Sequence, residues 1–251
     1  MYMSKKCATS SIYDTIYGGQ KKMSGGAYEG GGGASRNLEA IIYQKKDFLV
    51  KIFANLITQL GVTYYIMMNY DYKKDRLGLV KKRIWVVVVL LLITISVIAL
   101  VPMNMYLKFG AFTFFSALNG LLLSRLMQHV DPTIVEVAIL GTIGIFGALF
   151  LVGALLLSSG IVLGLRLGLF LLFALLVLII ALITSLFMGP DPIVSKYLTG
   201  IGLVLFSVYI VYDTNRILQK DYYGDFITAS LDYYLDIINV FIRMVAYGRS
   251  G

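Results

Sequence analysis

The chain has 251 residues, of which 58% are hydrophobic and only 14% are charged, and its formal net charge is +8. A soluble domain of this length needs more charge on its surface, so the composition predicts a protein whose solvent is a lipid bilayer. The single cysteine, Cys7, excludes an internal disulfide bond and a cysteine-based metal cluster, and the single histidine, His129, leaves little from which to build a catalytic triad or a zinc site.

In chain order, residues 1–35 are rich in glycine with scattered tyrosine and lysine, which is typical of a flexible tail. Residues 36–47 read as a short amphipathic lead that we expect near the membrane interface. Basic residues gather at 45–51 and 73–83, beside apolar segments. Clusters in such positions are typical of residues that meet lipid head groups, so we expect the bilayer as a partner and no nucleic acid.

Seven apolar segments follow, each near the roughly 20 residues that a helix needs to cross a bilayer. We expect spanning helices at 48–69, 84–106, 109–127, 133–156, 161–188, 195–218 and 225–247. The predicted fold class is an all-α membrane protein, with a seven-transmembrane-helix bundle over residues 48–251 and the tail and lead over residues 1–47. Four glycines of the fourth segment are expected to be close-packing positions between helices: Gly141, Gly144, Gly147 and Gly153.

The last segment, DFITASLDYYLDIINVFIRMVAYG, carries a set of charged and amide side chains within its apolar run. Asp232, Asp236, Asn239 and Arg243 follow the spacing i, i+4, i+7 and i+11, which returns to one face of a helix. A helix that faces lipid could not easily hold these groups. We therefore expect a central last helix with one polar stripe, surrounded by the other six.

The sixth segment adds a further carboxylate, Asp213, in LFSVYIVYDTNRIL (205–218). Counted from Tyr222 as the midpoint of the connection, Asp213 and Asp232 should lie at similar depth, with Asp236 one turn deeper. An aspartate at the centre of a membrane helix costs about 2.5–3.5 kcal/mol, so these groups must be paired, protonated or wet.

Two carboxylates within a few ångströms cannot both ionise cheaply, so the aspartates would titrate as a unit and act as a proton sensor. When deprotonated, they would bind a hard cation such as calcium weakly, with water completing its shell, as permeation requires. Arg216, three residues after Asp213, is a candidate neutralising partner.

Structural roles remain open for the same residues. Asp213 with Thr214 and Asn215 is also consistent with helix-end chemistry at the interface. Asp236, Asn239 and Arg243 are also consistent with a hydrogen-bonded clasp. We expect two other charged residues at the interface rather than in the site: Arg125 and Glu136.

The last two segments resemble a known family. GIGLVLFSVYIVYDTNRIL (200–218) followed by DFITASLDYYLDIINVFIRMV (225–245) is similar to the paired C-terminal signature of the Bax-inhibitor family, and the likeness extends to FANLITQL (53–60) and DPTIVEVAILGTIGIFG (131–147). The resemblance implies seven helices around a central last helix, a calcium leak sensitive to pH, and in some members suppression of cell death from internal membranes. The family's two sensor aspartates correspond to Asp213 and Asp236.

The sequence departs from the family in two places. Asp232 stands where many relatives carry Asn, and a third carboxylate would change the protonation behaviour or strengthen cation binding. The second segment, IWVVVVLLLITISVIALVPM (84–103), has no interior arginine to act as the family's latch, so Arg125 or Arg243 is the candidate replacement.

These expectations describe a pH-sensitive calcium leak channel that is not an enzyme. Asp213 and Asp236 would hold the permeant calcium transiently, Asp232 would join them, and Asn239, Arg243 and Arg216 would support them. We expect no tightly bound cofactor, and an internal membrane of the endoplasmic reticulum or Golgi type.

Two other functions share some of these features. One is a non-conducting membrane scaffold in a virion or organelle complex, with residues 1–35 docking a protein partner. The other is an intramembrane aspartyl protease, which would also need Gly-x-Gly-Asp and Pro-Ala-Leu elements that the sequence lacks.

Overall fold

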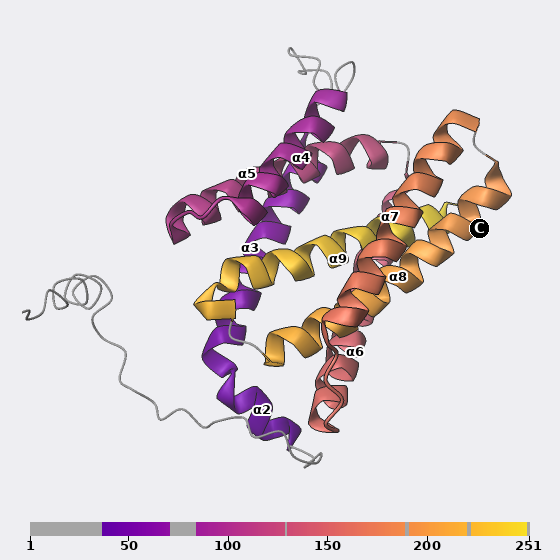
Figure 1. Ribbon diagram of the computed structural model, residues 1–251. Helices are drawn as coiled ribbons and strands as arrows, with labels where there is room; N and C mark the ends of the chain where they lie inside the picture. The colour runs from indigo at the N-terminus through magenta and orange to yellow at the C-terminus, as the bar shows by residue number, and fades with distance from the viewer. Residues whose placement is uncertain (1–36, 71–83, 129, 189–190, 220–221, 250–251) are drawn as a thin grey trace, which may run out of the picture. The chain divides into compact units, whose positions relative to one another are not determined.

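The structure is a computed structural model that describes residues 37–70, 84–128, 130–188, 191–219 and 222–249 (Figure 1). All of these residues belong to one compact unit, Ala34–Gly251. The expected tail at 1–35, the basic cluster at 73–83 and His129 lie outside the described residues. Regular structure in the described ranges is helical throughout.

The helices follow the expected order. They are α2 (Leu38–Gln44), α3 (Lys46–Asn69), α4 (Ile84–Leu100), α5 (Met105–Met127), α6 (Pro132–Ser158), α7 (Leu165–Met188), α8 (Pro192–Gln219) and α9 (Phe226–Gly248), with a short 3-10 turn at Tyr222–Gly224. The expected lead contains α2, which buries Ile41 and exposes Tyr43.

Length and composition make five of the described helices able to cross a membrane: α3, α5, α6, α7 and α8. The chain is therefore a multi-pass integral membrane protein. Helix α4 is apolar but has only 17 residues, and α9 contains the three charges of the polar stripe. The number of membrane crossings expected from the sequence, seven, thus remains a prediction.

The second expected helix was wrong at its end. It stops at Leu100 rather than at residue 106, because Pro102 cannot donate a backbone hydrogen bond and disfavours helical backbone in the residue before it. The next helix begins at Met105 rather than at residue 109, since the Asn104 side chain accepts a hydrogen bond from Leu107 N at 2.8 Å and caps the new helix.

The fifth expected helix begins at Leu165 rather than at residue 161, and a buried side chain of α8 explains why. Gly160 ends α6 with φ 82°, a left-handed conformation that favours glycine. The Asn215 amide then donates to Ile161 O at 3.0 Å and accepts from Leu163 N at 2.9 Å. It also donates to Gly153 O at 3.2 Å, so one side chain joins α6, the connection and α8.

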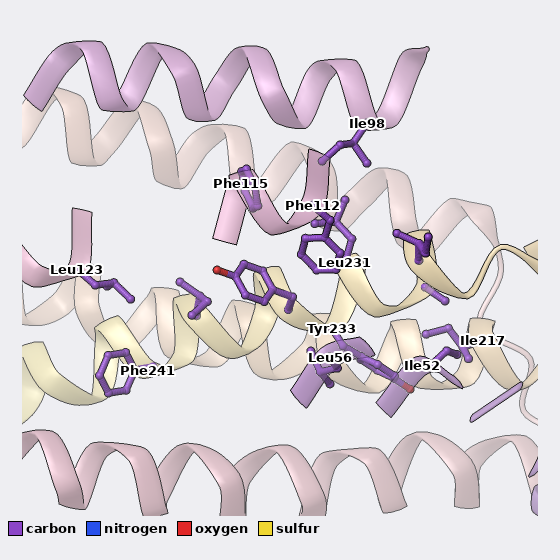
Figure 2. Close-up of a cluster of buried hydrophobic side chains, with 14 of the residues drawn as sticks. Ile52, Leu56, Ile98, Phe112, Phe115, Leu123, Ile217, Leu231, Tyr233 and Phe241 are labelled. Carbon is purple, nitrogen blue, oxygen red and sulfur yellow. The ribbon is translucent and has the colours of Figure 1, made fainter. Parts of the chain in front are cut away.

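Helix α9 contacts α3, α5, α6 and α8, and its buried tyrosines form the centre of the core (Figures 1 and 2). The Tyr233 ring packs against Phe53, Phe146 and Phe150, and its hydroxyl donates to Thr214 Oγ1 at 3.0 Å. The ring contacts therefore pack α9 against α3 and α6, and the hydrogen bond joins it to α8.

The four glycines of α6 differ in how closely other residues pack against them. A Cβ on Gly153 would lie 2.7 Å from Val211 O, so Gly153 is a close contact with α8. A Cβ on Gly144 or Gly147 would meet nothing within 4 Å, and both residues are exposed. The expectation that these two are close-packing positions was wrong. Gly141 would meet only the flexible end of Met244.

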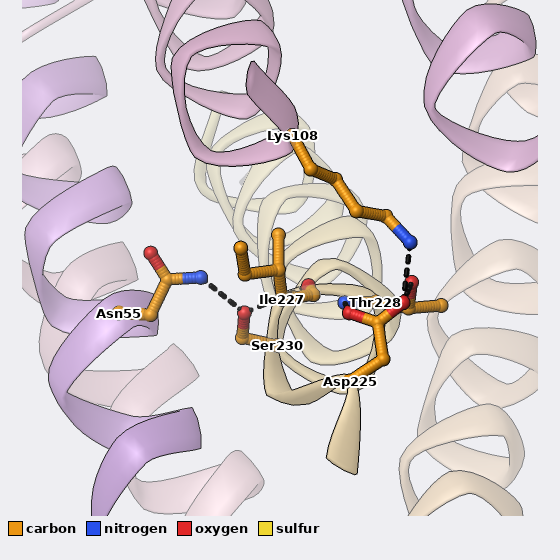
Figure 3. Close-up of polar contacts among 6 residues, drawn as sticks. All are labelled: Asn55, Lys108, Asp225, Ile227, Thr228 and Ser230. Carbon is orange, nitrogen blue, oxygen red and sulfur yellow. Dashed lines mark hydrogen bonds and ion pairs between the residues drawn. The ribbon is translucent and has the colours of Figure 1, made fainter. Parts of the chain in front are cut away.

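Polar contacts hold the beginning of α9 (Figure 3). Asp225 caps the helix by accepting from Thr228 N at 3.0 Å, and it forms an ion pair with Lys108 of α5. Although burial raises the pKa of Asp225, the hydrogen bonds from Lys108 and Thr228 outweigh it and hold that pKa below its usual range. Asn55 of α3 donates to Ser230 Oγ at 2.5 Å.

Candidate functional site

A cavity of about 770 Å³ lies along the polar face of α8 and α9. The polar residues that line it are Asp213, Arg216, Gln219, Asp232, Asp236, Asn239 and Arg243. The rest of its lining comes mainly from apolar side chains of α4 and α7, including Leu92, Leu169, Leu172 and Leu175. The whole stripe of α9 therefore faces one cavity, together with Asp213 and Arg216 of α8.

The three aspartates lie together in this cavity. Asp213 and Asp236 are both buried, and their carboxyl groups interact through a hydrogen bond. Such a bond between two carboxyl groups requires one of them to carry a proton. Asp232 acts electrostatically on both. Sequence counting placed Asp232 level with Asp213, but the hydrogen-bonding partner is Asp236, one turn further along α9.

Asp232 has a different partner at the connection between α8 and α9. The Tyr222 hydroxyl donates to Asp232 Oδ2 at 3.1 Å, and the Arg216 guanidinium lies 5.1 Å from the centre of the Tyr222 ring. Arg216 also interacts electrostatically with Asp232 and Asp213. Tyr222 adopts φ 46°, a left-handed conformation that is costly for a residue with a side chain. These contacts of its side chain offset that cost.

Cation-binding capacity in the cavity is modest. Asp236 Oδ2 is buried and has no hydrogen-bond partner among the described residues. No group of three or more histidine, cysteine, aspartate or glutamate side chains in the described part of the chain is arranged to hold a metal ion. The carboxylates can therefore offer a pair of oxygen ligands to a hydrated cation rather than a closed cage.

Among the described residues, the structure shows neither of the two structural roles that the sequence left open, a helix end at Asp213 and a hydrogen-bonded clasp at Asp236. Helix α8 continues to Gln219, so Asp213 does not lie at a helix end, while Thr214 and Asn215 point to α9 and α6 respectively. No hydrogen bond joins Asp236, Asn239 and Arg243 into a clasp, since the Asn239 amide donates to Leu235 O at 2.7 Å in its own helix.

Among the candidates for an arginine latch, Arg125 is exposed and does not line the cavity, and Glu136 is also exposed. Arg243 lines the cavity, but Arg216 is the arginine that acts on the aspartates. Sequence reasoning missed Tyr222 as a partner of Asp232. Tyr222 lies in the connection between α8 and α9, where no helical periodicity assigns a residue to a face. Its contact with Asp232 depends on the conformation of that turn.

Comparison with known proteins identifies the family. The profile described as "Inhibitor of apoptosis-promoting Bax1" matches residues 45–247, which is most of the chain. The chain belongs to the Bax inhibitor family. It is 30% identical over 207 residues to Bax inhibitor 1 of Schizosaccharomyces pombe, covering 79% of this chain and 74% of that protein.

Shorter segments of the chain are similar to other proteins. Protein LIFEGUARD 1 of Arabidopsis thaliana is 37% identical over 51 residues, or 20% of this chain and 22% of that protein. An uncharacterized protein of Helicobacter pylori is 37% identical over 67 residues, or 27% of this chain and 28% of that protein. The chain thus aligns with less than a third of these two relatives.

Proposed function

We propose that this Bax inhibitor family member is a calcium leak channel whose passage is switched by protonation of Asp213 and Asp236. The supporting observation is the hydrogen bond between these two buried carboxyl groups inside a cavity. A carboxyl pair that shares a proton is a two-state element, since gain or loss of that proton changes both charge and bonding.

In the protonated state, the shared hydrogen bond joins α8 to α9. When the proton leaves, two ionised carboxylates repel each other and expose oxygens that a calcium ion prefers. Asp236 Oδ2, which has no partner among the described residues, is the available ligand oxygen. Weak binding with water in the remaining positions lets the ion leave again, as conduction requires.

The proposal also covers the membrane topology, the location of the protein and its role in cell death. The seven helices from α3 to α9 would all cross the membrane, with α9 surrounded by the others. The membrane would be an internal one of the endoplasmic reticulum or Golgi type, and the protein would have no enzymatic activity and no tightly bound cofactor. Suppression of cell death is proposed because the family profile is described as an inhibitor of apoptosis-promoting Bax1.

The test is calcium flux into dye-loaded proteoliposomes at a series of pH values from about 5 to 8, where a shared carboxyl proton is exchanged. Wild type is compared with Asp213→Asn, Asp232→Asn and Asp236→Asn. We expect a pH-dependent flux whose dependence is lost in the Asp213 and Asp236 variants. Folded protein that gives no flux above empty liposomes at any pH would contradict the channel and favour a membrane scaffold.

A further inference from the structure

Arg243 is a cation in the cavity that has no acidic partner among the described residues. Its Nε atom is buried and has no hydrogen-bond partner in the described part of the chain. The nearest aspartate of its own helix, Asp236, lies seven residues away, or about 10 Å along the axis. A charged group inside a membrane protein normally has a counter-charge, so that counter-charge should come from a ligand.

A glycine of α8 leaves the space in which the Arg243 guanidinium lies. A Cβ added to Gly202 would lie 2.7 Å from Arg243 Nε and 2.9 Å from its Cζ, so the absence of a side chain at Gly202 makes the space that the guanidinium occupies. Two residues away, a Cβ on Gly200 would meet nothing within 4 Å. The fold therefore seats Arg243 against the backbone of α8.

The cavity has both polar and apolar lining residues, which suits a ligand with one polar and one apolar end. Apart from its polar residues it is lined mainly by apolar side chains, of which Leu92, Leu169 and Leu172 are exposed. The cavity is thus continuous with the surface that meets the hydrocarbon. An acyl chain that enters from the bilayer would contact the leucines of α7 on one side of the cavity.

Because the proposed function, on which this inference rests, has α9 cross the membrane, the position of Arg243 near one end of that helix favours a head group over a deeply buried ion. It lies five residues before the end of α9 at Gly248, or about 7–8 Å along the axis. Phosphate groups of the bilayer lie just beyond the hydrocarbon, within reach of an arginine at this depth. The planar guanidinium also matches two oxygens of one phosphate.

We propose that this cavity binds an anionic phospholipid, with its phosphate on Arg243 and one acyl chain along the leucines of α7. The site is distinct from the aspartates, which lie toward the other end of the stripe. The inference concerns binding and stands independently of calcium conduction.

The test is native mass spectrometry of the full chain in mild detergent, titrated with phosphatidylglycerol or with phosphatidylcholine that carries the same acyl chains. We expect wild type to bind phosphatidylglycerol about tenfold more tightly, which corresponds to roughly 1.4 kcal/mol. Arg243→Gln should abolish this preference, and Arg243→Lys should keep part of it. Gly202→Ala should weaken it, whereas the matched control Gly200→Ala should behave as wild type.

Folding of each variant is checked by size-exclusion chromatography and thermal unfolding. If Arg243→Gln fails to fold, the pair Gly202→Ala and Gly200→Ala decides the question. A preference that survives in folded Arg243→Gln, or that is equal in the two glycine variants, would overturn the proposal. Oleate that displaces phosphatidylglycerol at equal concentration would overturn the phospholipid assignment, since the ligand would then be a fatty acid.

Discussion

The carboxyl group of Asp213 on α8 is hydrogen-bonded to that of Asp236 on α9, whereas Asp232, one turn closer to the connection, accepts from Tyr222. The three carboxylates of the cavity are therefore not equivalent. Two of them form a pair that needs a shared proton, whereas the third accepts its hydrogen bond from a neutral hydroxyl and needs no proton for it.

Different behaviour is expected of Asp232 and Asp236 when each is replaced by asparagine. Asp232→Asn keeps an oxygen that accepts from Tyr222, so the leak should stay pH-dependent, with a midpoint moved by about one pH unit through the lost charge. Asp236→Asn removes the protonatable partner of Asp213, so its leak should no longer vary with pH. Flux measured in proteoliposomes over the same pH series checks both, and loss of pH dependence in Asp232→Asn would contradict the assignment.

Asn215 should be among the most costly residues to replace outside the aspartates. Its amide bonds Gly153 O, Ile161 O and Leu163 N, and a buried group left without a partner costs about 1–3 kcal/mol. Asn215→Ala is expected to lower the free energy of unfolding by about 3 kcal/mol or more. Denaturant unfolding followed by circular dichroism measures this.

The control for Asn215 is Asn69→Ala, because among the described residues the exposed Asn69 amide bonds only Tyr65 O in its own helix. That variant should change the free energy of unfolding by less than about 1 kcal/mol. Equal losses in the two variants would mean that Asn215 does not join α6 to α8.

Gly153 and Gly147 of α6 provide a matched pair for helix packing. Gly153→Ala should destabilise by about 1–3 kcal/mol, since its Cβ would overlap Val211 O and the Thr214 side chain of α8. Gly147→Ala should be neutral or stabilise by up to about 1 kcal/mol, because its Cβ meets open space and alanine favours a helix. Thermal unfolding in detergent distinguishes them, and a stable Gly153→Ala would refute this α6–α8 contact.

The ion pair of Asp225 with Lys108 should make stability depend on acid. The pKa of Asp225 is lowered in the folded state, so its contribution is fully present above the unfolded value of about 3.9 and is lost as the pH falls through the folded pKa. Asp225→Asn should therefore unfold at a lower temperature than wild type at neutral pH, and this difference should shrink below about pH 4. A difference that is constant from neutral pH to pH 3 would contradict the charge assignment.

Periodicity was enough to predict the helical segments and the face of the polar stripe. Apolar runs separated by proline and glycine located each helix, and the spacing of Asp232, Asp236, Asn239 and Arg243 placed them along one face. All four line the cavity. Helix ends were less predictable where a distant side chain decides them, as Asn215 does for the connection between α6 and α7.

Contacts that depend on the third dimension were outside the reach of the sequence. Tyr222 itself adopts a left-handed backbone conformation, and its hydroxyl donates a hydrogen bond to Asp232. This conformation could not be read from the sequence. The contact of Arg243 with Gly202 brings together residues of two helices that are far apart in the sequence. Glycines of α6 looked alike in sequence, yet only the structure separates Gly153, which touches α8, from Gly147, which does not.

The most direct test of the central claim is a double-mutant cycle on Asp213 and Asp236, read as calcium leak in proteoliposomes from about pH 5 to pH 8. If the two carboxyl groups act as one protonatable unit, Asp213→Asn, Asp236→Asn and the double variant should share the same flat pH profile. If each single variant keeps a pH-dependent leak and their effects add in the double variant, the two residues titrate independently, and the paired switch is contradicted.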